Sequence, residues 1–413
     1  MSTPTSTPQS LSHLKVLDMS RVLAGPWCGQ ILADLGADVI KVERPGVGDD
    51  TRGWGPPYLK DTNGKDTAEA AYYLAANRGK KSVAIDISKP EGQELIRKLA
   101  AQSDVLIENY KSGDLERYGL SYKQLKQQNP GLIYCSITGF GQTGPMRQVA
   151  GYDFIIQGIG GLMSITGERD DLAGGGPQKV GVAVADITTG MYSTVAILAA
   201  LAYRTQSGQG QHIDMALLDT QVAMIANMNM NYLVGGKVPK RQGNAHANIV
   251  PYQTFDAADG QFVIAVGNDS QFVKCCEAAG SDLHRDERFK KNTDRVRNRE
   301  ILVPLLAEVF KKRKVAEWVA LLEPVGVPVG AINNIEQVFA HPQVQARNMR
   351  VEAPHPLSGT VPMVASPMKM SLTPPQCNKA PPMLGQHTVS VLSERLGMTA
   401  DQLEALRSKG ILG

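Results

Sequence analysis

The sequence predicts an α/β protein in which a Rossmann-like large domain with a parallel sheet is joined to a smaller α/β domain. From residue 13 to about 207, short apolar stretches alternate with stretches of helical period. This alternation favours parallel strands covered by helices on both faces. A second, shorter α/β pattern runs over 260–313, and a proline-rich region follows from about 350. We therefore expect a small domain between two parts that pack together.

The elements of the large domain follow one another in regular order. The segment 26–37 predicts a helix because proline stands in its first turn and glycine near its end. The predicted strands are 13–20, 37–44, 81–87, 104–110 and 132–140. Further helices are predicted over 89–102, 122–129 and 188–205.

Beyond the large domain the pattern continues with a short strand and a long helix over 211–233, and a loop over 238–256. From about 350 periodicity is weak until two short helical stretches at 387–397 and 400–410. We expect this return to pack on the large domain. The predicted organisation is a disordered tail 1–12, a large domain 13–207, a linker helix and small domain 208–330, and a C-terminal return 331–413.

Composition excludes several classes of protein. The 413 residues carry a net charge of only +3, which is too weak to indicate nucleic acid or an anionic membrane as a partner. The five cysteines have no zinc-site spacing, and we expect them to be reduced. The start of the chain lacks the features of a secretory signal, and the longest apolar run, 195–203, is short for a membrane span. We expect a cytoplasmic protein without a bound metal.

Asp186 is the one residue within 180–201 with an acidic or basic side chain of the Asp, Glu, Lys, Arg or His type. Aspartate often caps a helix, although Thr188 and Thr189 follow and could do so instead. The apolar flanks place the carboxylate at a buried position, where a charge must be paired, neutralised or used. A desolvated carboxylate held against a thioester is a nucleophile that yields a mixed anhydride and a thiolate. Asp186 is therefore the candidate catalytic residue.

The glycine-rich stretch 151–170 precedes this acid and contains Gly160 and Gly161. It does not complete a dinucleotide-binding fingerprint. These glycines can serve as turn and packing residues, or their backbone N–H groups can stabilise an oxyanion in the acyl pocket.

Basic residues follow several of the predicted strands, where ligands approach a parallel sheet, and three more stand just before or at the start of the strand 81–87. Each can be an ordinary surface charge, but together they suit a ligand with several phosphates, such as coenzyme A. They are Arg44, Arg52, Arg78, Lys80, Lys81, Lys111 and Arg117.

Taken together, these stretches resemble the family III CoA-transferases, the CaiB/BaiF family of formyl-CoA, carnitine-CoA and dicarboxylate-CoA transferases. The resemblance covers nearly the whole chain and includes LKVLDMSRVLAGPWCGQILADLGADVIKVERPGVGDDTR, NRGKKSVAID, DVLIENYKSGDLERYGL, GYDFIIQGIGGLM and ADITTGMYSTVAILAAL. It implies an interlocked homodimer, in which each subunit has a Rossmann-like domain completed by the C-terminal segment.

The resemblance also implies roles for individual residues. Asp186 matches the nucleophilic aspartate of the family. Positions that line coenzyme A in the family match Val22, Leu23, Ala24, Arg44, Asn109, Tyr110 and Arg117. Two departures matter: the chain lacks the tetraglycine flap of formyl-CoA transferases, and Tyr152 stands where the related racemases carry a histidine.

The chain is most similar to the succinyl-CoA–glutarate members of the family, through WGPP, AGYD and AHANIVPYQTF. This implies transfer of CoA from succinyl-CoA to a dicarboxylate such as glutarate. The second carboxylate of the acceptor needs a cation, for which Arg52, Arg241 and His246 are candidates. The resemblance implies a reaction that proceeds through an aspartyl mixed anhydride and then an aspartyl-CoA thioester, with no metal and no tightly bound cofactor.

Three other functions remain as alternatives. An acyl-CoA racemase or epimerase on the same scaffold needs two proton-transfer residues at the α-carbon. A nicotinamide oxidoreductase needs a complete glycine fingerprint after the first strand, which RVLAGP does not provide. A non-catalytic CoA-binding protein would keep its role when Asp186 is replaced.

Overall fold

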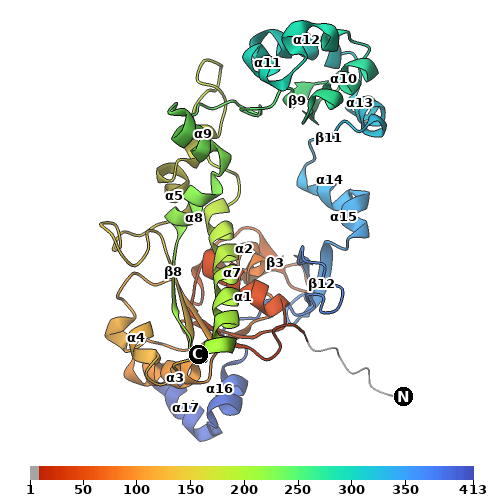
Figure 1. The fold of residues 1–413 in the computed structure, drawn as a ribbon. Helices are drawn as coiled ribbons and strands as arrows, with labels where there is room; N and C mark the ends of the chain where they lie inside the picture. The colour runs from red at the N-terminus through yellow and green to blue at the C-terminus, as the bar shows by residue number, and fades with distance from the viewer. Residues whose placement is uncertain (1–8) are drawn as a thin grey trace. The chain divides into compact units, whose positions relative to one another are not determined.

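A six-stranded parallel sheet forms the centre of the larger of two compact units (Figure 1). The structure, a computed structural model, describes residues 9–413. All five strand pairs of this sheet are parallel, which confirms the predicted fold class. The strands are β1 (Lys15–Asp18), β2 (Asp38–Glu43), β5 (Lys81–Ala84), β6 (Val105–Glu108), β7 (Ile133–Thr138) and β8 (His212–Ala216).

The strand order is β5-β2-β1-β6-β7-β8. The chain leaves β1 toward one edge and then returns to build β6 on the other side of β1, so the order reverses between these two strands. In open parallel sheets, ligands bind at the carboxyl ends of the strands at such a reversal point. The loops that follow Asp18 and Glu108 are therefore where a ligand is expected.

Helices cover both faces of the sheet, because successive residues of a strand point to opposite faces. Val16 belongs to a core with α1 (Ala24–Asp34) and α7 (Val184–Ser207). Leu17 belongs to a core on the other face that includes residues of α3 (Pro90–Ala101). The same core contains residues of α4 (Tyr122–Leu125), α16 (Thr388–Leu396) and α17 (Ala400–Ser408).

Helix α7 begins four residues earlier than the predicted segment 188–205 and extends over 24 residues. By length and composition alone it could cross a membrane. In the structure it packs against α1, β7 and β8, and Ile197 and Ala200 are buried in the core that covers the sheet. Packing inside the unit accounts for one side of this helix, whereas Met191, Tyr192 and Val195 are exposed.

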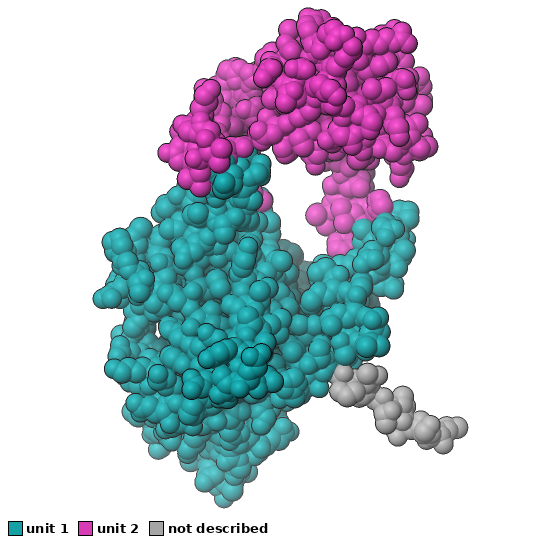
Figure 2. Space-filling view, viewed as in Figure 1, with its two compact units in different colours: residues 1–161, 181–230, 342–413 teal, residues 162–180, 231–341 magenta. Residues whose placement is uncertain are grey.

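The C-terminal residues 342–413 belong to the same unit as the sheet (Figure 2). The backbone N–H of His387 donates to Ser82 at 2.9 Å, and that of Asp86 donates to Ile411 at 2.9 Å. The expectation of little regular structure after residue 350 was wrong, because β12 (Arg350–His355) and β13 (Gly359–Val364) form an antiparallel hairpin. Buried and exposed residues alternate along this hairpin, as is typical of strands. Its prolines, which are rare in strands, made the segment look irregular in the sequence.

Several short elements connect the main ones. A hairpin of β3 (Tyr58–Lys60) and β4 (Asp66–Ala70) precedes α2 (Ala71–Ala75), and sequence patterns did not indicate it. The other connecting elements of the unit are η1 (Asp50–Gly53), η2 (Glu116–Tyr118), α5 (Asp153–Ile159), α8 (Leu217–Met224) and α15 (Pro342–Ala346).

The second unit comprises residues 162–180 and 231–341. Its three-stranded antiparallel sheet has the order β11-β10-β9, with β9 (Tyr252–Asp256), β10 (Gln261–Ala265) and β11 (Val329–Ala331). Phe262, Phe310 and Trp318 meet in its core. Its helices are α6 (Leu162–Ile165), α10 (Asp269–Ala278), α11 (Asn292–Arg297), α12 (Arg299–Phe310), α13 (Val315–Leu322) and α14 (Ile335–Ala340), with short turns η3 (Leu283–Arg285), η4 (Glu287–Phe289) and η5 (Glu323–Val325).

The unit boundaries differ from those expected. The predicted small domain began at 208, whereas β8 and α8 belong to the sheet unit and α9 (Asn227–Gly235) carries the chain from one unit to the other. The stretch 162–180 leaves the sheet unit earlier in the chain, which periodicity did not indicate. Of the predicted tail 1–12, residues 1–8 lie outside the described residues. Residues 9–12 form a turn in which the N–H of Leu11 donates to Leu35 at 2.9 Å.

Candidate active site

A cavity of about 260 Å³ lies at the carboxyl ends of β1 and β6, where the strand order reverses. The loop after β1, the loop after β6, the end of β7 and the first turn of α7 each contribute to it. Among its lining residues are Val22, Leu23, Ala24, Asn109, Tyr110 and Asp186. The structure thus brings the proposed nucleophile together with five of the residues that the resemblance assigned to coenzyme A.

Asp186 stands in the first turn of α7 and is partly buried. Burial, followed by the negative charge of Asp153, raises the pKa of its carboxyl to about 7. Within residues 9–413 no cation pairs with this carboxylate and no donor is hydrogen-bonded to it. The carboxylate is therefore only half ionised near neutral pH, and its lone pairs are available for reaction.

Asp186 does not cap its own helix. The N-cap is Ala183, which makes no side-chain capping bond. Thr188 and Thr189, the alternative caps, instead donate to the carbonyls of Val184 and Ala185, each at 2.7 Å. The capping interpretation of all three residues was wrong, because their side chains point along α7 or into the cavity and not across its first N–H groups.

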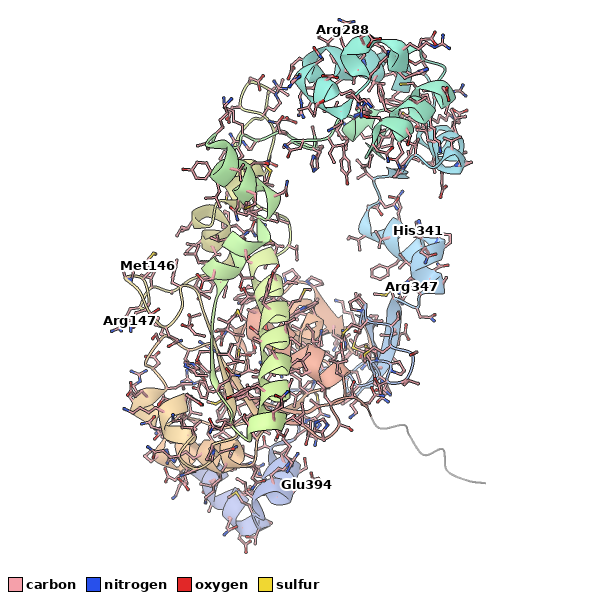
Figure 3. All side chains as sticks on the ribbon, in the orientation of Figure 1. Met146, Arg147, Arg288, His341, Arg347 and Glu394 are labelled. Carbon is pink, nitrogen blue, oxygen red and sulfur yellow. The ribbon has the colours of Figure 1, made fainter. Side chains whose placement is uncertain are left out.

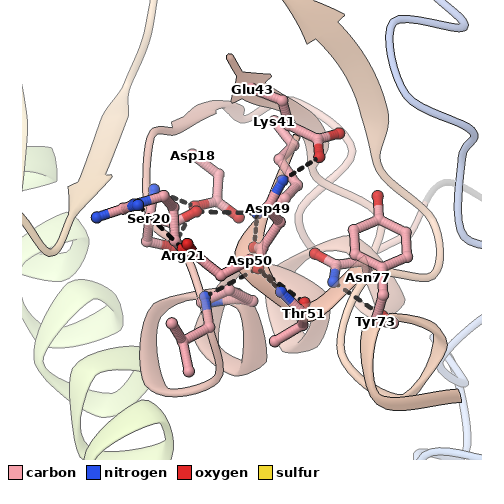
Figure 4. Close-up of polar contacts among 12 residues, drawn as sticks. Asp18, Ser20, Arg21, Lys41, Glu43, Asp49, Asp50, Thr51, Tyr73 and Asn77 are labelled. Carbon is pink, nitrogen blue, oxygen red and sulfur yellow. Dashed lines mark hydrogen bonds and ion pairs between the residues drawn. The ribbon is translucent and has the colours of Figure 1, made fainter. Parts of the chain in front are cut away.

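The turn after β1 is held in a strained shape by buried charges (Figure 4). Val22 has φ of 71°, a left-handed conformation that β-branched residues rarely adopt. Its N–H donates to Asp49 at 3.2 Å, and Lys41 donates to the carbonyl of Ser20 at 2.9 Å. The side-chain amide of Asn109 also bonds to this turn. Strain of this kind persists only when surrounding contacts impose it, and it is typical of ligand sites.

The carboxylates behind this turn are paired. Lys41 and Asp49 lie 2.8 Å apart, and both side chains are fully buried. Burial alone would raise the pKa of Asp49, but Lys41 and Thr51 outweigh it and hold the pKa at about 2. Asp18 likewise has a lowered pKa despite burial, because Lys80 and Lys41 are close. Both carboxylates are engaged by hydrogen bonds and buried lysines, so these charges stabilise the shape of the loop.

The basic residues expected to bind coenzyme A fall into two groups. Arg44 and Arg117 are exposed, and Arg117 lies 3.5 Å from Asp114 and against Tyr118. Arg78 and Lys80 are buried and bonded to Asp34 and Asp18. Burial lowers the pKa of Lys80 to about 8 even beside its partner. Of the two remaining predicted cations, Lys81 pairs with Asp38 and Lys111 lines the cavity.

Gly160 and Gly161, the predicted oxyanion residues, end α5. A side chain at Gly160 would meet Gln221 and the carbonyl of Ile156, so close packing accounts for this glycine. Gly161 has φ of 85° and is at the turn that follows the helix. Neither residue lines the cavity that contains Asp186.

The three candidates for the substrate carboxylate lie in different surroundings. The guanidinium of Arg52 is buried and donates to Glu43 and Glu69, each at 2.8 Å. Arg241 donates to carbonyls of the second unit and pairs with Asp170. His246 accepts the N–H of Asn248 at 3.0 Å through Nδ1 and lies beside Tyr252. Arg52 thus has its donors engaged within the sheet unit, whereas Arg241 and His246 are on a loop of the second unit.

Sequence reasoning missed several residues of the site. Arg21 and Arg147 line the cavity, and Arg147 is on the loop after β7 (Figure 3). Lys111 and Arg147 also line a neighbouring cavity of about 370 Å³ that contains Glu108. Burial raises the pKa of Glu108 to about 7. Arg21 is the first residue of RVLAGP, which follows the first predicted strand. This position after a strand was the signal in the sequence that could have identified Arg21.

Within residues 9–413 no group of three or more histidine, cysteine or acidic side chains is arranged to hold a metal ion.

Comparison with known proteins agrees with this geometry. The model of CoA-transferase family III matches residues 11–388. A succinate–glutarate CoA-transferase of Agrobacterium fabrum is 52% identical over 386 residues, which are 93% of this chain and 95% of the relative. The human succinyl-CoA:glutarate CoA-transferase is 43% identical and covers 99% of this chain, with 92% of its own length matched.

A solved structure gives the same result for the fold. A CaiB/BaiF family protein from Brucella suis is 51% identical and superimposes with a TM-score of 0.83, covering 94% of this chain and 100% of its own. With a family match over residues 11–388, relatives of 43–52% identity and a shared fold, the chain belongs to CoA-transferase family III.

Proposed function

We propose that this CoA-transferase moves CoA from succinyl-CoA to a dicarboxylate, with glutarate as the preferred acceptor. The similar proteins of Agrobacterium fabrum and human named above carry this activity in their names, at 52% and 43% identity over nearly the full chain. The structural observation that supports it most is the unpaired carboxylate of Asp186, whose pKa is raised to about 7, at the reversal point of the sheet.

The reaction begins when a carboxylate oxygen of Asp186 attacks the thioester carbonyl. The C–S bond breaks, and a mixed anhydride and the CoA thiolate are formed. The thiolate then attacks the aspartyl carbonyl, which releases succinate and leaves an aspartyl-CoA thioester. The acceptor carboxylate attacks this thioester, and CoA thiolate leaves again. Its final attack on the new acyl group regenerates Asp186, so neither ATP nor a metal is needed.

Positive charge near the cavity supports binding of the phosphates. Arg21, Lys111 and Arg147 line the cavity, and the exposed Arg44 and Arg117 are the further CoA-binding residues that the family resemblance implies. Leu23 and Ala24, at the start of α1, line the same cavity, and we propose that their N–H groups stabilise the oxyanion. Arg52 is engaged by two carboxylates and Arg241 by Asp170, so neither guanidinium is free to bind the distal carboxylate of the acceptor as the side chains stand.

We also propose an interlocked homodimer and a cytoplasmic location. The dimer is inferred from the family resemblance. The location is supported by the five free cysteines, four of which are buried. Size-exclusion chromatography with light scattering tests the first proposal, and a fluorescent fusion tests the second. A monomeric enzyme with full activity would contradict the dimer.

Racemisation on the same scaffold is the alternative. It needs two proton-transfer groups beside the α-carbon. The cavity, as far as residues 9–413 line it, contains no histidine, and Tyr152 lies where the racemases have one. Incorporation of deuterium at the α-carbon without exchange of acids would favour racemisation over transfer.

An acceptor screen tests the proposal directly. The enzyme is incubated with succinyl-CoA and glutarate, malate, citramalate, mesaconate or itaconate, and new thioesters are identified by mass spectrometry. We expect glutaryl-CoA to form fastest. Hydroxylamine or borohydride added during turnover should modify Asp186. Modification at another residue, or none in a sample that is turning over, would contradict the mechanism.

A further inference from the structure

The first turn of α7 is capped from another helix. One carboxylate oxygen of Asp153, the first residue of α5, accepts the N–H of Ala185 at 2.8 Å and that of Asp186 at 3.4 Å. The other oxygen accepts the side-chain amide of Gln157 at 2.7 Å. Since α7 has no side-chain cap of its own, Asp153 satisfies donors that its N-terminus would otherwise leave open.

This arrangement changes the electrostatic environment of Asp186. The N-terminus of a helix normally stabilises a carboxylate in its first turn, through the helix dipole and free N–H groups. Here the nearest N–H groups are directed to Asp153, and within residues 9–413 none is bonded to the carboxylate of Asp186. A second negative charge therefore stands where a stabilising donor would be expected.

We propose that Asp153 is a positioning residue for the acyl transfer: it fixes the first turn of α7, and its charge destabilises the ionised form of Asp186. The role is distinct from that of the nucleophile, since Asp153 acts through Asp186 and not on the acyl group. The inference rests on the proposed function, in which Asp186 carries the acyl group.

The chemical advantage follows from the balance of the first step. Asp186 carboxylate and thioester become anhydride and CoA thiolate, so one negative charge moves from an oxygen to a sulfur. An ordinary aspartate, with a pKa of about 3.9, is far less basic than a thiolate of about 8.5, and the step is uphill. Raising the pKa of Asp186 to about 7 removes much of that difference. The repulsion between Asp153 and Asp186 favours this step, because the repulsion falls as the negative charge leaves Asp186.

The other ionisable groups around Asp186 do not supply this effect. Tyr72 of α2 feels the charge of Asp186 and has a raised pKa itself, mainly through burial. The charged groups of the cavity are Arg21, Lys111, Asp114 and Arg147, with the phenols Tyr110 and Tyr152. Besides Asp153, the elements packed on α7 carry Cys28, Asp34, Tyr134, Cys135, His212, Asp214 and Asp219. Besides burial, only Asp153 shifts the pKa of Asp186.

The test replaces Asp153 by asparagine, which keeps an acceptor for the two N–H groups and removes the charge. The quantity measured is kcat/KM for succinyl-CoA against pH, with glutarate as acceptor. In the wild type, kcat/KM should fall toward low pH with a midpoint near pH 7, which we call the acidic limb of the profile. We expect this acidic limb to move down by about one pH unit in Asp153→Asn. The plateau at high pH should fall about threefold, because the carboxylate becomes a weaker base. Asp153→Glu should keep the limb of the wild type.

Asp401→Asn is the matched control, since it also removes one acidic charge from the first turn of a helix, α17, and is exposed. It should leave both limb and plateau unchanged. If Asp153→Asn does not fold, Asp153→Ser provides a second neutral variant for the same measurement. A purely structural role for Asp153 would lower the plateau and leave the limb in place, and that result would overturn the inference.

Trapping separates this inference from the proposed function. If hydroxylamine modifies Asp186 in the wild type but the limb of Asp153→Asn does not move, only the role of Asp153 is wrong. If the wild type turns over without modification at Asp186, the proposed mechanism itself is wrong.

Discussion

Two groups of buried carboxylates lie close together in the sheet unit, and they differ in their partners. Asp18 and Asp49 are each bonded to a buried lysine, and their pKa values are lowered. Asp186 has a carboxylate as its nearest charged neighbour and a pKa of about 7. Burial is common to both groups, so burial alone does not mark a reactive acid. What distinguishes Asp186 from Asp18 and Asp49 is that no cation within residues 9–413 is bonded to its carboxylate.

The largest expected effect is that of Asp186→Asn. Because the nucleophile is removed, kcat should fall by more than about 10³-fold. Coenzyme A should still bind, since the lysines and arginines of the cavity remain, and calorimetric titration measures this. A variant that retained a tenth of the activity would break the comparison, because the unpaired acid would then have no special role.

The second effect concerns stability. Lys41→Met leaves Asp49 buried without its partner and should lower the free energy of unfolding by about 3–5 kcal/mol. Urea denaturation measures this. The matched control is Lys60→Met, which breaks an exposed pair with Asp66 and should cost at most about 1 kcal/mol. Equal losses in the two variants would contradict the structural role of the buried pair.

The third effect is a pH dependence with opposite signs in the two groups. The pKa of Asp186 is raised, so its contribution to stability is full below about pH 4 and is lost as pH rises through about 7. The pKa of Asp49 is lowered, so its contribution is present above about pH 4 and is lost as pH falls toward 2.

Comparison of the wild type with Asp186→Asn isolates the contribution of Asp186 to the pH dependence of stability. Between pH 4 and pH 8 the wild type should lose about 2–4 kcal/mol of unfolding free energy relative to the variant. Over the same range its activity should rise as the nucleophile ionises. A constant difference between the two proteins would show that the carboxyl titrates at an ordinary pKa.

The smallest effect is that of Arg147→Ala. Arg147 lines the cavity and is exposed, and we expect it to make one solvent-screened contact with a phosphate of CoA. We expect KM for succinyl-CoA to rise about three- to tenfold while kcat stays within twofold. A fall in kcat without a change in KM would place Arg147 nearer to the reaction than to the phosphates.

Much of the fold could be predicted from the sequence, because the strands of a parallel sheet are apolar and their helices keep a clear period. The hairpin β3–β4 escaped prediction because a strand such as DTAEA has neither property. The exchange of the chain between units at residues 162–180 depends on contacts distant in sequence. Asp186 could be identified because the apolar residues that mark it as buried are its neighbours in the sequence.

Its surroundings were harder to predict. Arg78, Lys80 and Arg52 look like ligand-binding cations in sequence, and only the structure shows them bonded to Asp34, Asp18 and Glu43. The contact of Asp153 with α7 joins residues 32 positions apart. Which charges neutralise one another is a property of the folded chain and cannot be obtained from spacing alone.

The docking of residues 342–413 on the sheet unit has a consequence for biosynthesis. Strand β5 gains its contact with His387, and the nearby Asp86 its contact with Ile411, only after synthesis has passed these late positions and they have left the ribosome. The core around Phe262 and Trp318 uses a continuous segment that ends at residue 341 and is complete earlier. Translation that stops short of the final helix would therefore yield a chain whose inserted unit is whole and whose catalytic unit is open along one edge.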